Sequence, residues 1–327
     1  MSILLVTHSQ DPAGAELAAA LEAQGAVPVR LDTDLYPHEV RLTTSYRDGE
    51  VGGWLVTAAG RFPLADVTAV WYRRFAAARG LPAELGSARE ACVEESRKTL
   101  FGMIASLPVL HIDPIRRVLN ADHKELQLRL AMGLGLQIPR TLFSNDEDVV
   151  RQFYHQLNGA VVCKLHGNYG VENQFVYTNR LRQGDLAGLK DLRYSPMIFQ
   201  EAVPKRLELR ATVVGRRVFT AAVDSQRSER SQTDWRRDPE AMAEAWESYT
   251  LPADVESGLL RLTARLGLNY GGADFILTPD GRHVFLEVNS GGEWLWLARK
   301  PGLPIAQALA ELLVGRSEPI DPAEVSV

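Results

Sequence analysis

Residues 283–296 read HVFLEVNSGGEWLW and place an acid and an amide, Glu287 and Asn289, inside an apolar run typical of a β-strand. Side chains alternate between the faces of a strand, so Phe285 should lie beside Glu287 and Asn289, with Leu286 and Val288 on the opposite face. A buried carboxylate without a partner is costly, and two oxygen ligands suit a hard cation such as Mg²⁺. An edge strand with a solvated acid is the alternative that these residues alone leave open.

The preceding residues 270–282, YGGADFILTPDGR, predict the partner strand of a hairpin, with the turn at 279–281. An antiparallel pairing would bring Asp274 across from Glu287 and Asn289, so three oxygen-bearing side chains would share one surface. Two neighbouring acids repel each other unless a cation lies between them. The hairpin therefore favours a Mg²⁺ site over the solvated edge strand.

Two lysines stand where an anion could bind. Asp122 and Glu125 resemble a capping box, which would place Lys124 in the first turn of a helix. Lys164 lies in the apolar run VVCK at 161–164, where its charge needs a partner. The loop that follows could cover a phosphate group, although it matches no Walker A pattern. A solvated position remains the alternative for each lysine.

Residues 197–226, MIFQEAVPKRLELRATVVGRRVFTAAVDSQ, predict a strand stopped by Pro204 and a hairpin that turns at Gly215. Glu208 and Arg210 would share one face of the first hairpin strand, either as a site or as an exposed ion pair. The polar segment 227–240, RSERSQTDWRRDPE, holds Trp235 among charges, as a loop anchor or as part of a binding surface.

The first third of the chain alternates strand and helix signals, beginning with ILLVT at 3–7, and so predicts a βαβ start. It has no G-x-G-x-x-G motif, which weakens a dinucleotide-binding interpretation. AVWYRR at 69–74 predicts a further strand, residues 84–106 a long helix, and HIDPIRRV at 111–118 a linker between domains.

Composition limits the number of domains and the classes of function that the chain could have. The chain has 327 residues, 46% of them hydrophobic, which is enough for two or three domains. A net charge of −5 gives no basic surface for nucleic acid, and no run of apolar residues is long enough to span a membrane. The N-terminus has no positive region before its apolar stretch, so we expect a cytoplasmic protein. Two cysteines without a metal-binding pattern predict neither a disulfide framework nor a zinc site, and base rates favour a homodimer.

The order of these features resembles the ATP-grasp fold. The segments RLDTD, AVWYRR, GMIASL, HKELQL, LELR, GRRVFTAAVDSQ, DWRR, GLNYGGADFILTPDGR and VFLEVN are more specifically similar to the macrocyclases that make microviridins and other graspetides. The likeness covers nearly the whole chain, and it implies a mixed α/β and α+β chain. An N-terminal α/β (pre-ATP-grasp) domain is expected at 1–115, a central ATP-grasp subdomain at 116–200 and a C-terminal subdomain with the metal site at 201–327.

The resemblance also implies roles for residues of this sequence. Residues that would bind ATP are Lys124 and Lys164 at the phosphates, Glu201 to Val203 as the hinge to adenine, and Glu208 at the ribose. Residues that would carry Mg²⁺ are Asp274, Glu287 and Asn289. Catalytic residues at the transferring phosphate and the substrate carboxylate would be Arg210 and Arg236, and residues that would bind substrate are Arg74, Asp234 and Trp235.

The implied reaction uses ATP to activate Asp or Glu side chains of a precursor peptide, composed of a leader and an acidic core, as acyl phosphates. Ser or Thr hydroxyls, or Lys amines, then close ester or amide rings. Two alternatives stay open: an ATP-grasp carboxylate–amine ligase for a free amino acid or small peptide, and a non-catalytic protein that binds nucleotide and peptide. The sequence departs from the family where Ser290-Gly291-Gly292 replaces a proline after Glu-x-Asn.

Overall fold

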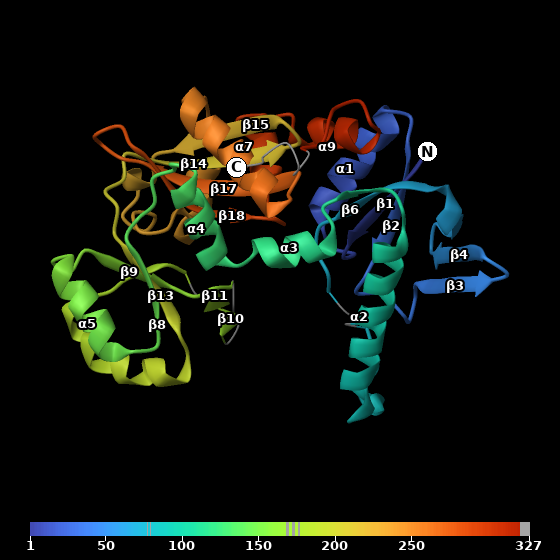
Figure 1. Ribbon diagram of the computed structural model, residues 1–327, viewed down its shortest axis with the longest axis horizontal. Helices are drawn as coiled ribbons and strands as arrows, with labels where there is room; N and C mark the ends of the chain where they lie inside the picture. Colours follow the sequence, from blue (N-terminus) through green and yellow to red (C-terminus); the bar gives the residue numbers. More distant parts are fainter. Residues whose placement is uncertain (77, 79, 168–169, 172–173, 176, 321–327) are drawn as a thin grey trace.

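The computed structural model describes residues 1–76, 78, 80–167, 170–171, 174–175 and 177–320. Figure 1 shows an N-terminal sheet in blue, a central sheet in green, and a C-terminal sheet in orange and yellow that lies between the two. The mixed α/β and α+β class predicted from the sequence is confirmed. Within the described parts of the chain, no helix combines the length and the apolar character needed to cross a membrane.

The N-terminal sheet is parallel, in the order β2-β1-β6-β7. Its strands are β1 (Ser2–Thr7), β2 (Val27–Asp32), β6 (Val67–Tyr72) and β7 (Leu110–Ile112). Helix α1 (Pro12–Ala23) connects β1 to β2, and its first turn is capped by the Asp11 carboxylate, which accepts from the Ala13 N–H. The predicted linker at 111–118 is a structured segment that contains the last two residues of β7 and the first four of α3 (Ile115–Ala121), and its role between two domains stays a prediction.

An antiparallel sheet that the sequence analysis did not predict lies beside the parallel one. It contains β3 (Arg41–Arg47), β4 (Glu50–Thr57) and β5 (Gly60–Pro63). Asp48 and Gly49 join β3 to β4 with φ of 51° and 82°, the left-handed pair that a tight hairpin requires. After the short helices η1 (Leu64–Asp66) and η2 (Ala83–Leu85), the long helix α2 (Ala88–Ser106) begins four residues later than predicted.

The central sheet is antiparallel, in the order β12-β9-β13-β8. Its strands are β8 (Thr141–Ser144), β9 (Val161–Lys164), β12 (Asn179–Arg180) and β13 (Met197–Glu201). Helices α5 (Glu147–Gln156) and η3 (Gln183–Tyr194) pack on it through a small apolar core that includes Val150, Leu189 and Phe199. A hairpin of β10 (Gly170–Val171) and β11 (Gln174–Phe175) follows β9.

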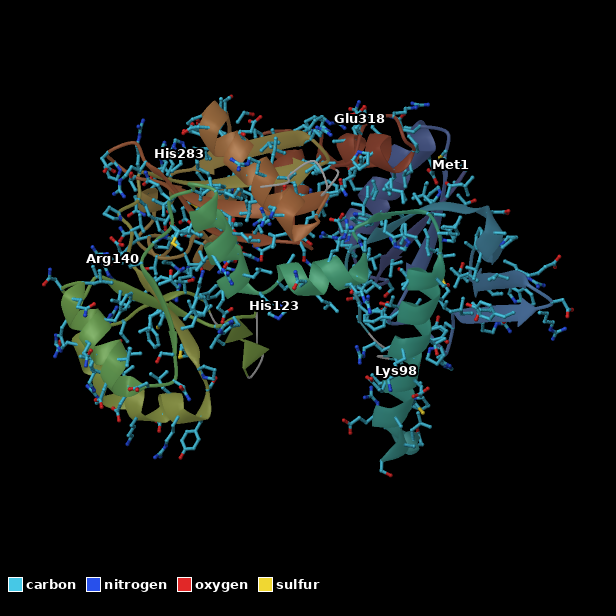
Figure 2. The ribbon with its side chains drawn as sticks, in the orientation of Figure 1. Met1, Lys98, His123, Arg140, His283 and Glu318 are labelled. Carbon is cyan, nitrogen blue, oxygen red and sulfur yellow. The ribbon has the colours of Figure 1, made fainter. Side chains whose placement is uncertain are left out.

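Helix α4 (Lys124–Gly133) precedes the central sheet, and Figure 2 labels His123 at its start and Arg140 close to β8. The predicted capping box is wrong, because His123 occupies the N-cap position and makes no side-chain cap bond. Asp122 instead ends α3, and its carboxylate accepts a hydrogen bond of 2.8 Å from the Ser290 hydroxyl. Lys124 nevertheless lies in the first turn of α4, as predicted.

The C-terminal sheet is antiparallel, in the order β16-β15-β14-β17-β18. Its strands are β14 (Leu207–Val214), β15 (Arg217–Val223), β16 (Glu247–Tyr249), β17 (Tyr270–Leu277) and β18 (His283–Asn289). Helix α7 (Ala253–Leu266) packs against one face, and α9 (Ile305–Leu313) lies against α1 of the N-terminal part (Figure 1). The remaining helices are η4 (Ser225–Arg227), η5 (Trp235–Arg237), α6 (Pro239–Ala243) and α8 (Leu295–Arg299).

The pairing of β17 with β18 contains a β-bulge. Asp274 lies opposite Glu287 as predicted, but Phe275 lies opposite Phe285, which leaves Leu286 as the extra residue. Alternation is interrupted there, so the expectation that Phe285 shares a face with Glu287 is wrong: Phe285 is fully buried in the core under the sheet. The bulge turns Glu287 toward the opposite, polar face.

Candidate active site

A pocket of about 1300 Å³ lies where the N-terminal, central and C-terminal parts meet. Every site residue predicted from the sequence lines this pocket. They are Arg74, Lys124, Lys164, Glu201, Val203, Glu208, Arg210, Asp234, Trp235, Arg236, Asp274, Glu287 and Asn289. Of the predicted loop after Lys164, residues 168–169, 172–173 and 176 lie outside the described residues.

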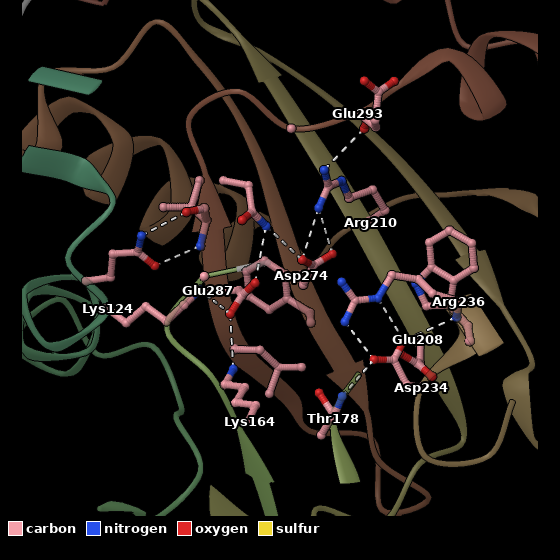
Figure 3. Close-up of a pocket in the computed structure, with 18 of the residues that line it drawn as sticks. Lys124, Lys164, Thr178, Glu208, Arg210, Asp234, Arg236, Asp274, Glu287 and Glu293 are labelled. Carbon is pink, nitrogen blue, oxygen red and sulfur yellow. Dashed lines mark hydrogen bonds and ion pairs between the residues drawn. The ribbon is translucent and has the colours of Figure 1, made fainter. Parts of the chain in front are cut away.

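One end of the pocket carries an ion triad that joins three elements (Figure 3). Glu287 on β18 accepts from the Lys124 ammonium of α4 at 2.7 Å and from the Lys164 ammonium of β9 at 3.0 Å, both through Oε2. All three side chains are less than one-fifth exposed. Burial disfavours the charged carboxylate, but Lys164 and Lys124 outweigh this effect and hold the pKa of Glu287 well below its usual range.

Asp274 and Asn289 continue this polar face toward Arg210. The Asn289 amide donates to Asp274 Oδ2 at 3.2 Å and to Glu287 Oε1 at 3.3 Å. Arg210 Nη1 donates to both oxygens of Asp274, at 2.9 and 3.0 Å. Burial, together with repulsion from Glu287, raises the pKa of Asp274 in spite of the Arg210 guanidinium.

The donor set of this face fits a hard divalent cation. Two carboxylates and one amide are the oxygen donors that Mg²⁺ takes together with phosphate oxygens. The Asn289 N–H₂ group now bridges the two acids, and rotation of the amide would direct its oxygen into the same space. Within the described residues, no three His, Cys, Asp or Glu side chains converge.

A second ion pair lies across the pocket. Arg236 donates to Asp234 through Nε at 2.8 Å and Nη2 at 2.6 Å, a bidentate contact that lowers the pKa of Asp234 against the effect of burial. Asp234 also accepts from the Thr178 N–H at 3.3 Å, which ties the segment to the central part of the chain. Arg236 remains 44% exposed and so keeps donors free for an anion.

Trp235 belongs to an aromatic cluster with Trp246 and Trp296, whose ring centroids lie 5.2 and 5.4 Å from that of Trp235. The Arg210 guanidinium carbon lies 5.6 Å from the Trp296 ring centroid. The cluster therefore anchors the 234–237 segment and supports one side of the Arg210 guanidinium.

The predicted nucleotide end is formed by β13 and β14. The N–H groups of Ala202 and Val203 donate to backbone carbonyls, of Ala160 at 2.8 Å and of Glu201 at 2.9 Å. Glu208 accepts from Lys205 at 3.0 Å, and burial raises the pKa of Glu208 in spite of this contact. Lys205 was missed by the sequence analysis, although its place in VPKRLELR, between Pro204 and β14, offered a signal.

Two further lining residues were also missed. Gln127 on α4 bonds both backbone groups of Val288 and so fixes the helix against β18. Arg73 is almost fully buried next to the predicted Arg74, and both arginines pair with the Glu293 carboxylate. Arg74 does so at 2.8 Å with 43% of its side chain exposed, so it remains accessible from the pocket.

Comparisons with known proteins concern the whole chain and its family. The profile of the MvdD pre-ATP grasp domain matches residues 2–119. Macrocyclase MdnC from Microcystis aeruginosa MRC, solved with precursor peptide MdnA, is 42% identical over 96% of this chain and 100% of that one, with a TM-score of 0.88. Macrocyclase MdnB from the same organism is 40% identical over 96% and 99% of the two chains, with a TM-score of 0.79.

A RiPP-associated ATP-grasp ligase from Chryseobacterium gregarium, in complex with ADP and a leader and core peptide, is 31% identical over 98% of both chains, with a TM-score of 0.91. No curated protein of similar sequence was found. Identity and coverage of this extent show that the chain belongs to the RiPP-associated ATP-grasp macrocyclases, which are ATP-dependent ligases.

Proposed function

We propose that this protein cyclises a ribosomally made precursor peptide by joining Asp or Glu carboxylates to Ser, Thr or Lys side chains, as microviridin-type macrocyclases do. The observation that carries the proposal is the ion triad. Lys124 and Lys164 hold Glu287 across the gap between the central and C-terminal sheets, at the place where phosphates and a cation would fit. ADP in the related ligase and precursor peptides in both relatives support a nucleotide and a peptide as ligands.

ATP binding would exchange the partners within the triad. The two lysines would turn from Glu287 to phosphate oxygens, and Glu287, Asp274 and Asn289 would hold Mg²⁺. When bound, Mg²⁺ would neutralise phosphate charge and so allow an anionic nucleophile to approach. The hinge at 201–203 would bind adenine, and Glu208 would accept from the ribose hydroxyls.

Two arginines would serve the reacting groups. A substrate carboxylate oxygen attacks the γ-phosphorus, the bond to the bridging oxygen breaks, and ADP leaves. A hydroxyl or amine of the same peptide then attacks the acyl carbon, loses its proton and releases phosphate. The peptide therefore loses one water molecule for each ring that forms. Arg210 and Arg236 would stabilise the negative charge of both steps, while Arg74, Asp234 and Trp235 would position the peptide.

Several finer properties belong to the same proposal. We propose domain boundaries at 115 and 200, which lie three residues after the end of β7 at Ile112 and one residue before the end of β13 at Glu201. We place the reaction in the cytoplasm, where ribosomes supply the peptide. We assign no nucleic-acid partner because the net charge is −5, and no membrane partner because no apolar run of the sequence is long enough to span a bilayer. A homodimer is proposed from base rates alone.

The test is an intact-mass measurement on an acidic precursor peptide that contains Ser, Thr and Lys, incubated with enzyme, ATP and Mg²⁺. Loss of one water per ring is expected with the wild type and not with Glu287→Gln, and mild alkaline hydrolysis then distinguishes ester from amide. Glu311→Gln, which alters a carboxylate paired with Arg217 away from the pocket, is the matched control. ATP consumption with free amino acids and without ring formation would instead support the alternative ligase.

A further inference from the structure

The loop that follows β18 is held by a buried arginine of the N-terminal part. Arg73 directly follows β6, and its side chain is 1% exposed. Its Nη1 donates to Gly292 O at 3.1 Å and to Gly291 O at 3.4 Å, and its Nη2 pairs with the Glu293 carboxylate. Asp11, at the start of α1, holds Arg73 Nε at 2.9 Å. The guanidinium therefore connects the first helix of the chain to three consecutive loop residues.

The same loop is in direct contact with Arg210. Arg210 Nη2 donates to Glu293 O at 3.1 Å while Nη1 binds Asp274. A Cβ atom added at Gly272 would lie 2.4 Å from Arg210 Nη2, and one added at Gly292 would lie 2.5 Å from the same atom. The guanidinium thus packs between two glycine backbones, and a shift of residues 292–293 would move it.

The loop is fixed at further points. Tyr270 donates through its hydroxyl to Gly292 O at 2.6 Å, so this carbonyl accepts from two buried donors. Ser290 donates to Asp122, just before α4. These contacts tie the loop to both the N-terminal sheet and the start of α4.

We propose that Arg73 is a positioning residue of the ligase. It fixes the carbonyl groups of Gly291 and Gly292 and the carboxylate of Glu293, and the Glu293 carbonyl in turn fixes the guanidinium of Arg210 beside the reacting carboxylate. The inference rests on the proposed function, because it takes Arg210 as the group that meets the reacting atoms. Through this contact the N-terminal domain takes part in forming the active site.

Arg73→Lys tests the proposal. Lysine keeps the charge next to Asp11 but loses the planar fork that serves two carbonyls and a carboxylate together. Misplacement of a reacting group by about 1 Å costs about 10²-fold, so we expect kcat for ring formation to fall about 10- to 100-fold. KM for ATP should stay nearly unchanged, because no proposed nucleotide contact is removed.

A double-mutant cycle separates positioning from a general loss of stability. If Arg73 acts through Arg210, then Arg73→Lys should have little further effect in an Arg210→Lys background. Independent, purely structural damage would multiply the two losses. Arg217→Lys is the matched control, since Arg217 also binds a carboxylate (Glu311, 2.8 Å) and a backbone carbonyl (Ala308, 3.1 Å) but lies away from the pocket.

Tyr270→Phe is the second variant, in case Arg73→Lys folds poorly, because it removes the other donor to Gly292 O. Amide hydrogen exchange of residues 290–297 should increase in both variants and not in Arg217→Lys. A wild type that forms no rings would overturn the proposed function. An active wild type with a fully active Arg73→Lys, or with multiplied losses in the double mutant, would overturn the positioning role alone.

Discussion

The two ends of the pocket are held in different ways. At the triad end, Lys124, Lys164 and Glu287 meet only through the tips of their side chains, from three separate elements. At the other end, Arg73 and Arg210 bind backbone carbonyls of the 291–293 loop. A side-chain ion pair exchanges its partner when a ligand arrives, whereas a bond to the main chain holds unless the loop itself moves. The first end is therefore suited to exchange, and the second to fixed geometry.

Loss of the shared acid should have the largest effect. Glu287→Gln removes the charge that would hold the cation, which is worth several kcal/mol in the transition state, so kcat for ring formation should fall about 10³-fold or more. A time course of intact masses measures the rate, with Glu311→Gln as the control. Substantial activity in Glu287→Gln would show that the triad end does not hold the cation.

The packing around the Arg210 guanidinium can be disrupted without removing a charge. Gly272→Ala places a Cβ atom against the Arg210 guanidinium, and we expect kcat to fall about 10²-fold by displacement of that group. Gly271→Ala is the matched control, because its Cβ would meet Val288 Cγ2 at 2.8 Å, away from Arg210. Gly271→Ala should lower thermal stability but keep kcat per folded molecule. Equal losses of kcat in the two variants would contradict the distinction.

Lys164→Met tests whether a lysine of the ion triad binds ATP. It would remove the charged hydrogen bond proposed between Lys164 and an ATP phosphate, worth about 1.5–3 kcal/mol, so KM for ATP should rise about 10- to 100-fold. Steady-state kinetics at varied ATP measures this, with Lys190→Met, at an exposed lysine of η3, as the control. An unchanged KM would remove Lys164 from the nucleotide site.

The triad also predicts a pH dependence of the ligand-free protein. The pKa of Glu287 is depressed by its two lysines, so the charged carboxylate stabilises the fold above about pH 4.5, and this stabilisation is lost as the pH falls below that value. In Lys164→Met the pKa of Glu287 should be less depressed, so the loss of stability on acidification should be smaller and should be complete at a higher pH. Urea unfolding midpoints across acidic pH measure both curves, and coincident curves would contradict the coupling.

The smallest effect is expected at Arg74, the exposed neighbour of Arg73. Arg74 is 43% exposed, and exposed ion pairs are worth about 0.2–1 kcal/mol, so Arg74→Lys should change KM for the peptide about fivefold at most. Kinetics with the precursor at saturating ATP measures the effect. A loss as large as that of Arg73→Lys would mean that exposure does not distinguish the two arginines.

The local parts of this site could be predicted from sequence. The turn at 279–281 and the alternation of strand residues placed Asp274 opposite Glu287, and the same rule placed Glu208 and Arg210 on one face of β14. The Asp48-Gly49 turn between β3 and β4 was also present in the sequence and was not used. Short-range stereochemistry determines all of these features.

Other features depend on contacts between distant segments. No residue type marks the bulge at Leu286, and Asp122 ends α3 because the chain turns there before α4 begins. Strand β6 is buried almost throughout, so its pattern does not say which of Arg73 and Arg74 is buried. Arg73 is the buried one because it bonds the 291–293 loop, which lies more than two hundred residues further along the chain.

The outer edge of β18 is partly covered by hydrogen bonds from other segments of the chain. This strand lies at the edge of the five-stranded sheet, yet the Gln127 side chain bonds the N–H and the C=O of Val288, and Gln137 O accepts from the Phe285 N–H. An extended peptide therefore cannot bind these backbone groups by adding a strand. The same contacts protect the strand that carries Glu287 from edge-to-edge aggregation. We therefore expect a peptide substrate to reach the acids from the face of the sheet, through its side chains.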